Sequence, residues 1–253
     1  MKVSLCIPAY NEEKIIKDTV KTLDDYMKAN FDDYEILISN DGSTDNTASA
    51  ASELSLPNVR VVGYDKNRGK GCAVRTAILE STGDVAIFTD CDLAYGTDVI
   101  KTMADMFEDN PDADMVIGSR NISADGYEGY TLIRKIASKT YIKVLCLFGG
   151  FKLSDSQCGM KGFRRAAADK IFPLCEVDRW AFDFEILIWA TEFGMKILEM
   201  PVKIINHRES KINVLSDTFK MLRDVVKMKK SIKKKKKGLE NAYTFLITGY
   251  ATF

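Results

Sequence analysis

Residues 85–92, VAIFTDCD, decide the fold class, because they join an apolar run to two aspartates that stand one residue apart. The run 85–89 is short, β-branched and aromatic, which is typical of a buried strand. Asp90 and Asp92 follow where this strand would end. Ligands of parallel sheets bind beyond the carboxyl ends of the strands, so the pair is a candidate cation site. The alternative interpretation is a solvated pair of surface carboxylates.

The same pattern extends along the first half of the chain. Strand-like runs, most of them followed by a turn signal and a helix-length segment, cover residues 3–7, 35–39, 59–62 and 115–117. This alternation predicts an α/β fold with a mostly parallel central sheet flanked by helices. After Gly118 the alternation stops. Helical patterns over 131–148, 165–172 and 182–193 then precede a final expected strand over 196–205.

Length and composition favour one globular domain. The chain has 253 residues, of which 46% are hydrophobic and 28% charged, enough for a single large core. We expect residues 1–210 to form this domain and residues 211–253 to form a basic amphipathic helix, over 214–230, and a tail. The six cysteines lack metal-type spacing and no signal peptide precedes the first strand, which predicts a reduced, cytoplasmic protein. No apolar run reaches the roughly 17 residues of a membrane-spanning helix.

Charge is balanced overall but unevenly distributed. The 36 basic and 36 acidic residues cancel, which argues against a nucleic-acid-binding protein. From residue 211 onward, however, eleven basic residues face three acidic ones, a net charge of +8 that includes the run Lys233 to Lys237. We expect this arm, together with a basic amphipathic stretch over 134–151, to contact an anionic membrane surface. The alternatives are a solvated chain end and ordinary core packing.

Several motifs together resemble a known family. In order, they read PAYNE at 8–12, DGS at 41–43, NRGKG at 67–71, and then Asp90 and Asp92. This set resembles the family 2 glycosyltransferases of the GT-A fold, a single Rossmann-like domain. In the second half, GSR at 118–120, DSQCGMK at 155–161 and RWAFDFE at 179–185 resemble the dolichyl-phosphate β-glucosyltransferase branch, which is related to the dolichyl-phosphate mannose synthases. The resemblance covers roughly residues 1–228.

The resemblance implies a binding site for a nucleotide sugar. Asp92, with help from Asp90, would hold Mg²⁺ or Mn²⁺, the hard cations that oxygen ligands favour. The residues that would contact the donor are Pro8, Tyr10, Glu12, Asp41, Lys70 and Asp90. Two of them have plain structural alternatives, since Asp41 also suits a turn and Glu12 suits the first turn of a helix.

The acceptor decides which catalytic residues are needed. A polyprenyl phosphate is already ionised near neutral pH, with a second pKa of about 6, so it needs cations more than a base. Arg120, Arg134 and Arg208 match positions where related enzymes place such arginines, although surface ion pairing is the alternative. Trp180 would line the acceptor pocket or belong to the core. A sugar hydroxyl would instead need a general base, for which Asp155 is the candidate.

The sequence therefore predicts an inverting, metal-dependent transferase that moves glucose from UDP-glucose onto a dolichyl or undecaprenyl phosphate. We expect it to act at the cytoplasmic face of a membrane as a peripheral protein. The alternatives are mannosyl transfer from GDP-mannose, transfer to a saccharide hydroxyl, and a catalytically silent nucleotide-sugar-binding scaffold. The sequence leaves the oligomeric state open.

Overall fold

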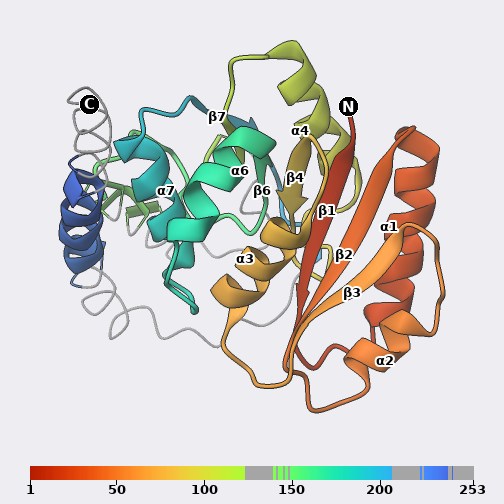
Figure 1. Ribbon diagram of the computed structural model, residues 1–253. Helices are drawn as coiled ribbons and strands as arrows, with labels where there is room; N and C mark the ends of the chain where they lie inside the picture. Colours follow the sequence, from red (N-terminus) through yellow and green to blue (C-terminus); the bar gives the residue numbers. More distant parts are fainter. Residues whose placement is uncertain are drawn as a thin grey trace, which may run out of the picture.

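The computed structural model describes residues 1–122, 139–140, 142–144, 146–147, 149–206, 223, 225–238 and 241. These residues build a seven-stranded sheet with the strand order β3-β2-β1-β4-β6-β5-β7 (Figure 1). The strands are β1 (Val3–Ala9), β2 (Tyr34–Asp41), β3 (Val59–Tyr64), β4 (Val85–Phe88), β5 (Met115–Ser119), β6 (Lys161–Arg164) and β7 (Ile197–Pro201). The helices are α1 (Ile16–Asn30), α2 (Thr47–Ser52), α3 (Lys70–Glu80), α4 (Asp98–Asp109), α6 (Arg165–Ile171) and α7 (Phe182–Glu192), with a 3-10 turn, η1, at Phe172–Leu174.

Helices cover both faces of the sheet. Residues alternate between the faces along each strand, so that Leu5 and Ile7 point to one side and Cys6 to the other. On the first face the strands pack against α1, α2 and α4, and on the second against α3, α6 and α7. The predicted α/β class with a mostly parallel sheet is confirmed, and β1 pairs in parallel with both β2 and β4.

The strand β6 was missed, and it changes the second half of the sheet. It lies antiparallel between β4 and β5. Its sequence, KGFR, is short, begins and ends on a charged residue and contains a glycine, so it carries no strand pattern. Only its two neighbours, which come from distant parts of the chain, make it a strand.

The last strand is shorter than the expected range 196–205. β7 pairs with β5 in parallel, and the register ends at Ser119 opposite Pro201. The Val202 N–H still donates to the Ser119 carbonyl at 3.1 Å, but the next N–H after β5, that of Arg120, donates to Asp155, and Pro201 has no N–H to donate. Residues 202–206 therefore leave the sheet and cross toward the loop that follows β4, where Ile205 N–H donates to the Ala94 carbonyl at 2.8 Å.

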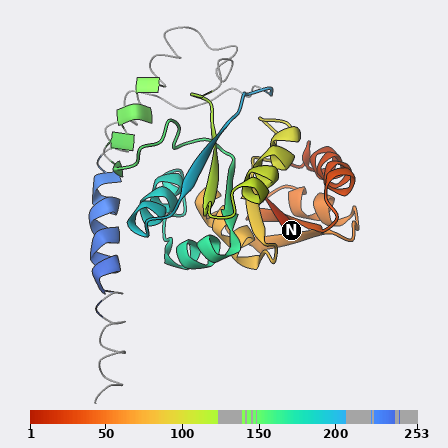
Figure 2. The ribbon, with the colours of Figure 1, turned by 90° about the horizontal axis from the view of Figure 1, so that it is seen from above.

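The described part of the C-terminal region is helical over residues 225–238, and it packs on the body (Figure 2). Val225 and Ile232 are buried in the same apolar core as α7, and Met228 packs against that core. Of the expected helix over 214–230, residues 214–222 and 224 lie outside the described residues, and the described helix continues past 230 to residue 238. Among the residues that the structure describes, no helix has both the length and the apolar character needed to cross a membrane. All six cysteines are buried and free.

Candidate functional site

The site lies at the topological switch point of the sheet, where the order in which the chain adds strands changes direction. The chain runs from β1 outward to β2 and β3, then returns to place β4 on the other side of β1. Between such neighbouring parallel strands, the loops at the carboxyl ends diverge and leave room for a ligand. The loops that follow β1, β2, β3 and β4 carry the predicted donor residues, so the fold gathers them at one edge.

Asp41, the last residue of β2, is buried and holds the loop that follows β3. Its Oδ1 accepts hydrogen bonds from the Tyr64 hydroxyl at 2.7 Å and from the Arg68 backbone N–H at 2.9 Å. Its Oδ2 accepts from Asn67 Nδ2 at 2.9 Å, and the Gly69 N–H lies 2.9 and 3.0 Å from the two oxygens. The carboxylate therefore organises this loop. Contact with a nucleotide stays a prediction and would require one of these donors to be exchanged.

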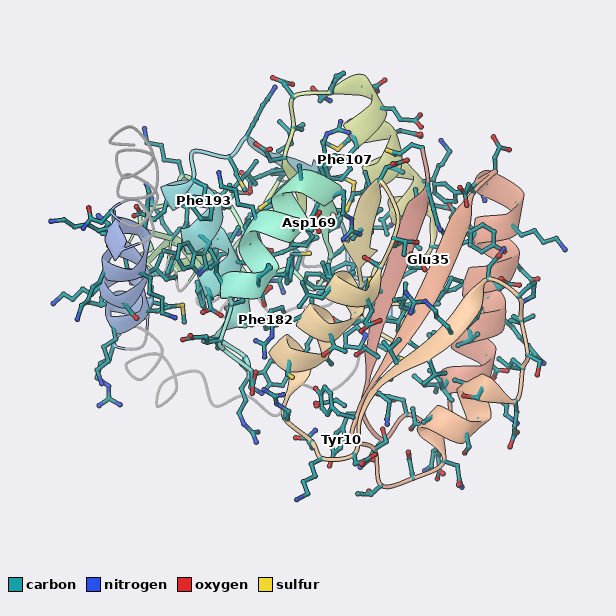
Figure 3. The ribbon with its side chains drawn as sticks, viewed as in Figure 1. Tyr10, Glu35, Phe107, Asp169, Phe182 and Phe193 are labelled. Atoms are coloured by element: carbon teal, nitrogen blue, oxygen red, sulfur yellow. The ribbon has the colours of Figure 1, made fainter. Side chains whose placement is uncertain are left out.

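The loop after β1 carries the other predicted nucleotide contacts. Tyr10 is 45% exposed and lies at the lower end of the sheet in Figure 3, while Pro8 and Glu12 are half-buried. Asn11 adopts the left-handed conformation, with φ of 55°, and bonds to the loop after β2. The Glu12 N–H donates to the Thr47 hydroxyl at 2.8 Å. These bonds fix the loop and leave the Tyr10 ring available to a ligand.

Asp90 and Asp92 follow β4, and both are half-buried. The strand ends at Phe88, and Leu93, with φ of 50°, forms a tight turn in which its N–H donates to the Asp90 carbonyl at 3.1 Å. The break that the sequence argument required is therefore present. Lys70, the first residue of α3, forms an ion pair with Asp90, and Asp92 Oδ1 accepts from the Ala94 N–H at 3.1 Å.

The two carboxylates fit a hard divalent cation by their chemistry. Both are oxygen donors at the rim of the crevice, and the Asp90 side chain is 33% exposed. Among the described residues there is no group of three or more His, Cys, Asp or Glu side chains that could hold a metal ion alone. Asp90 and Asp92 leave coordination positions that oxygens of a bound diphosphate or of water could fill, as in Mg²⁺ sites of phosphate-processing proteins.

A second, deeper pair of charges lies behind Lys70 and Asp90, and the sequence argument missed it. Lys161 is fully buried, and its Nζ donates to Asp183 Oδ1 at 2.5 Å and to the Cys158 carbonyl at 2.6 Å. Burial raises the pKa of Asp183, while the neighbouring Lys161 and Lys70 act against that rise. No local signal could have identified this pair, because KGFR carries no strand pattern and Asp183 lies 22 positions further along the chain.

Arg120 and Asp155 form a bidentate ion pair beyond the end of β5. Arg120 Nε donates to Asp155 Oδ2 at 2.7 Å, and Nη2 donates to Oδ1 at 3.0 Å. Asp155 is 0% exposed. Burial acts to raise its pKa, and the Arg120 guanidinium outweighs that effect, so the pKa lies below its ordinary value. This geometry argues against the expected general-base role of Asp155, because both oxygens are occupied and the carboxylate is a weak base.

Trp180 is exposed, not part of the core. Its ring is 68% accessible, in the loop that precedes α7. This loop touches the donor loop, since Asp178 pairs with Arg68 at 3.0 Å and its carbonyl would lie 2.6 Å from a Cβ at Gly69. Trp180 is therefore an exposed residue of a loop that touches the candidate donor loop. Arg134 and Arg208, the other expected acceptor residues, lie outside the described residues.

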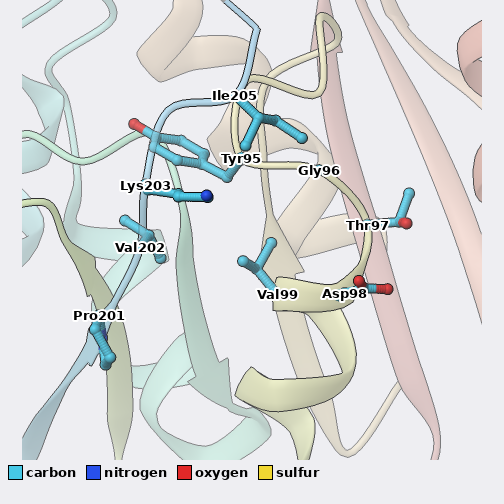
Figure 4. Close-up of a pocket in the computed structure, with 9 residues that line it drawn as sticks. All are labelled: Tyr95, Gly96, Thr97, Asp98, Val99, Pro201, Val202, Lys203 and Ile205. Atoms are coloured by element: carbon cyan, nitrogen blue, oxygen red, sulfur yellow. The ribbon is translucent and has the colours of Figure 1, made fainter. Parts of the chain in front are cut away.

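A shallow cavity of about 420 Å³ adjoins the Asp92 loop on its other side (Figure 4). It lies between the start of α4 and the segment that follows β7. Its lining includes Tyr95, Val99, Val202, Lys203 and Ile205. The cavity is distinct from the crevice that holds Asp90, but it shares the loop 92–97 with it.

Comparison with known proteins agrees with this geometry. The family model described as glycosyl transferase family 2 matches residues 4–172. A dolichyl-phosphate beta-glucosyltransferase of Dictyostelium discoideum is 33% identical over 230 residues, which cover 85% of this chain and 69% of that protein. A dolichyl-phosphate beta-glucosyltransferase of Trichomonas vaginalis is 32% identical over 220 residues, or 82% of this chain and 65% of that protein. The chain thus spans about two thirds of the length of these relatives.

A solved structure supports the fold. Glucosyl-3-phosphoglycerate synthase from Mycobacterium tuberculosis, in complex with Mn²⁺, UDP and glucosyl-3-phosphoglycerate, superposes with a TM-score of 0.66 at 19% identity. The match covers 90% of this chain and 78% of that one. The fold and the motifs define a glycosyltransferase of the GT-A type. The chain belongs to glycosyl transferase family 2.

Proposed function

We propose that this protein transfers glucose from UDP-glucose to a polyprenyl phosphate, of the dolichyl type, at the cytoplasmic face of a membrane. The observation that carries the proposal is the pair of half-buried carboxylates, Asp90 and Asp92, next to the Lys70 ammonium at the crevice between β1 and β4. Support for the acceptor comes from the relatives that carry the name dolichyl-phosphate beta-glucosyltransferase. UDP and Mn²⁺ occur together in the solved neighbour.

Each residue would have a role that follows from its position in the crevice. Tyr10 and the loop that Asp41 organises would bind the nucleoside, with Pro8 and Glu12 beside them. Asp92, with Asp90, would hold Mg²⁺ or Mn²⁺, which would neutralise the diphosphate as it leaves. Lys70 would turn from Asp90 toward the diphosphate, since its ammonium has three donors on a flexible stem.

The bond changes follow from an ionised phosphate acceptor. A phosphate oxygen attacks C1 of the sugar from the face opposite the diphosphate, the C1–O bond to the diphosphate breaks, and UDP departs with the electron pair. An α-linked donor then gives a β-linked glycosyl phosphate. No proton has to be removed from the acceptor, because its second pKa is about 6. Three residues would bind the acceptor: Arg134 and Arg208, which match arginine positions of related enzymes, and Trp180, which is exposed.

The buried Arg120–Asp155 pair bears on the choice of acceptor. A saccharide hydroxyl needs a base with free lone pairs, whereas Asp155 has both oxygens engaged by Arg120 and by the Gln157 N–H at 3.1 Å. Arg120 is correspondingly tied to Asp155, so its role is to shape the acceptor side of the site more than to meet a phosphate directly. The engaged carboxylate of Asp155 favours the phosphate acceptor, while the engagement of Arg120 leaves Arg134 and Arg208 as the arginines that would meet the phosphate.

The test is a matrix of donors and acceptors. UDP-glucose and GDP-mannose are each incubated with a short polyprenyl phosphate and with a saccharide, in Mg²⁺, in Mn²⁺ and in excess chelator. We expect a β-linked glucosyl phosphate from UDP-glucose only, and only with metal. Product from GDP-mannose, product on a sugar hydroxyl, or full activity in chelator would each refute the corresponding part of the proposal. Nucleotide binding without any turnover would favour the scaffold alternative.

A further inference from the structure

The buried pair of Lys161 and Asp183 connects two elements that meet behind the donor site. Lys161 begins β6 and Asp183 lies in the first turn of α7, 22 positions apart. Lys161 Nζ also lies 5.6 Å from the centre of the Phe88 ring, at the end of β4. The pair therefore sits at the junction of β4, β6 and α7, directly beneath the residues that precede Asp90 and Asp92.

One route from this pair leads to Asp90. The bond from Lys161 Nζ to the Cys158 carbonyl, 2.6 Å long, fixes the segment just before β6. Gly159, the next residue, lies so close to Asp90 that a Cβ there would stand 2.3 Å from Asp90 Oδ2. The Gly159 N–H is also held, since it donates to the Tyr95 hydroxyl at 3.3 Å. The backbone that Lys161 anchors thus forms the wall against which the Asp90 carboxylate rests.

The other route leads to Lys70. The start of α7 packs tightly on the start of α3, because a Cβ at Gly71 would stand 2.6 Å from the Cβ of Phe182. This contact brings the Asp183 carboxylate within electrostatic range of the Lys70 ammonium, which itself pairs with Asp90. Charges therefore alternate from the interior to the crevice, from Lys161 through Asp183 and Lys70 to Asp90.

We propose that Lys161 and Asp183 are positioning residues for the donor site, which hold Lys70 and Asp90 in place for a metal-bound nucleoside diphosphate. When Lys70 turns from Asp90 to the diphosphate, Asp183 keeps its ammonium at the rim, and Asp90 becomes available to the cation. Neither residue of the pair touches the donor. This inference rests on the proposed donor and adds the two residues behind it.

The decisive variant removes both charges together. Breaking one partner would leave a buried unpaired charge, whereas replacing a buried ion pair by apolar residues of similar size is often neutral for stability. In Lys161→Met with Asp183→Leu, we expect a melting temperature near that of the wild type. The calorimetric Kd for Mn²⁺ with UDP should rise roughly 10- to 100-fold, the usual effect of losing groups that orient metal ligands. The donor KM should rise more than kcat falls.

Two further variants control this result. Gly159→Ala leaves the pair intact but pushes on Asp90 directly, so it should also weaken Mn²⁺–UDP binding. Glu35→Gln disturbs a polar cluster at the opposite end of β2, where Glu35 Oε1 accepts from the Ser4 hydroxyl at 2.7 Å. This control should lower the melting temperature without changing the Kd. A raised Kd in Glu35→Gln would attribute the effect to general loosening and overturn the inference.

The outcomes separate the inference from the proposed function. If the wild type binds Mn²⁺–UDP and the double variant binds it equally well, the positioning role is wrong and the donor assignment stands. If the wild type itself does not bind, the donor assignment fails and the positioning role fails with it. Should the double variant not fold, Asp183→Asn, which keeps an acceptor for Lys161, decides the question, and an unchanged Kd there overturns the inference.

Discussion

The carboxylates at the end of β4 and those of the second half of the chain have the same chemistry but opposite surroundings. Asp90 and Asp92 are half-buried at the crevice, and the Asp90 side chain is 33% exposed. Asp155 and Asp183 are buried and each faces a cationic side chain, Arg120 and Lys161 respectively. All four belong to motifs that resemble the same family, yet only the first two are placed to meet a ligand.

This difference separates residues that act on a ligand from residues that shape the site. A half-exposed carboxylate can exchange a lysine or water for a cation at little cost. A buried one cannot leave its partner without stranding two charges in the interior. The comparison predicts that variants at the end of β4 should lose activity while keeping the fold, and that variants that remove one partner of a buried pair should first lose stability.

The largest effect is expected for Asp92→Asn. The change keeps the size of a half-buried side chain, so the melting temperature should stay close to that of the wild type, while the cation loses its anionic ligand. Because a bound metal supplies several kcal/mol of transition-state stabilisation, transfer should fall on the order of 10³-fold or more. The measurement is initial rate with Mn²⁺ beside a thermal melt. Near-normal rates would place the metal elsewhere.

Arg120→Met tests the buried side of the comparison. The variant leaves the Asp155 carboxylate in the interior without its bidentate partner, which typically costs about 3–5 kcal/mol of unfolding free energy. Urea denaturation at pH 7 measures the loss. The control is Lys17→Met, which removes an ion pair to Glu53 between side chains 47% and 63% exposed and should cost less than about 1 kcal/mol. Equal losses of unfolding free energy in Arg120→Met and Lys17→Met would contradict the distinction between buried and exposed ion pairs.

The pH dependence of stability sharpens the same contrast. In the folded state the pKa of Asp155 lies below that of an unfolded Asp, which is about 3.9, because Arg120 outweighs burial. Its contribution is therefore present above about pH 3.9 and is lost as the pH falls through the lower folded pKa. The difference in unfolding free energy between the wild type and Asp155→Asn should narrow on acidification. A difference that stays constant down to pH 2 would show that the charge of Asp155 contributes nothing.

The smallest effects are expected in the lysine run. Lys235 lies 2.5 Å from Glu176 and Lys236 pairs with Glu192, whereas Lys233, Lys234 and Lys237 are exposed, and of these three only Lys233 approaches Glu192, at 3.9 Å. The sequence predicted five lysines for a membrane surface, but in the structure two of them, Lys235 and Lys236, are half-buried against the body. Lys234→Gln with Lys237→Gln should weaken binding to anionic vesicles by about 1 kcal/mol per residue at low salt.

The matched variant, Lys235→Gln with Lys236→Gln, should instead lower the unfolding free energy, by less than about 1 kcal/mol per ion pair. Vesicle flotation and urea denaturation, run on both variants, distinguish the two groups of lysines. Unchanged vesicle binding in Lys234→Gln with Lys237→Gln would identify the exposed pair as solvated surface residues.

The sequence by itself determined the features that depend on local pattern. The alternation of apolar strands with helices predicted the parallel core of β1 to β4, because the hydrophobic periodicity of a strand or a helix shows within a few consecutive residues. The same strands located Asp90 and Asp92, since a strand end can be read from its own residues.

Only the tertiary structure decided which charges meet. β6 forms because β4 and β5 present free edges on either side of it, not because KGFR favours a strand. Arg120 and Asp155 are 35 positions apart, and Lys161 and Asp183 are 22 apart, so no local period records either pair. Packing between distant segments decides whether a carboxylate faces the crevice or a buried cation. A carboxylate at the crevice can bind a ligand, whereas one paired with a buried cation can only support the residues that bind it.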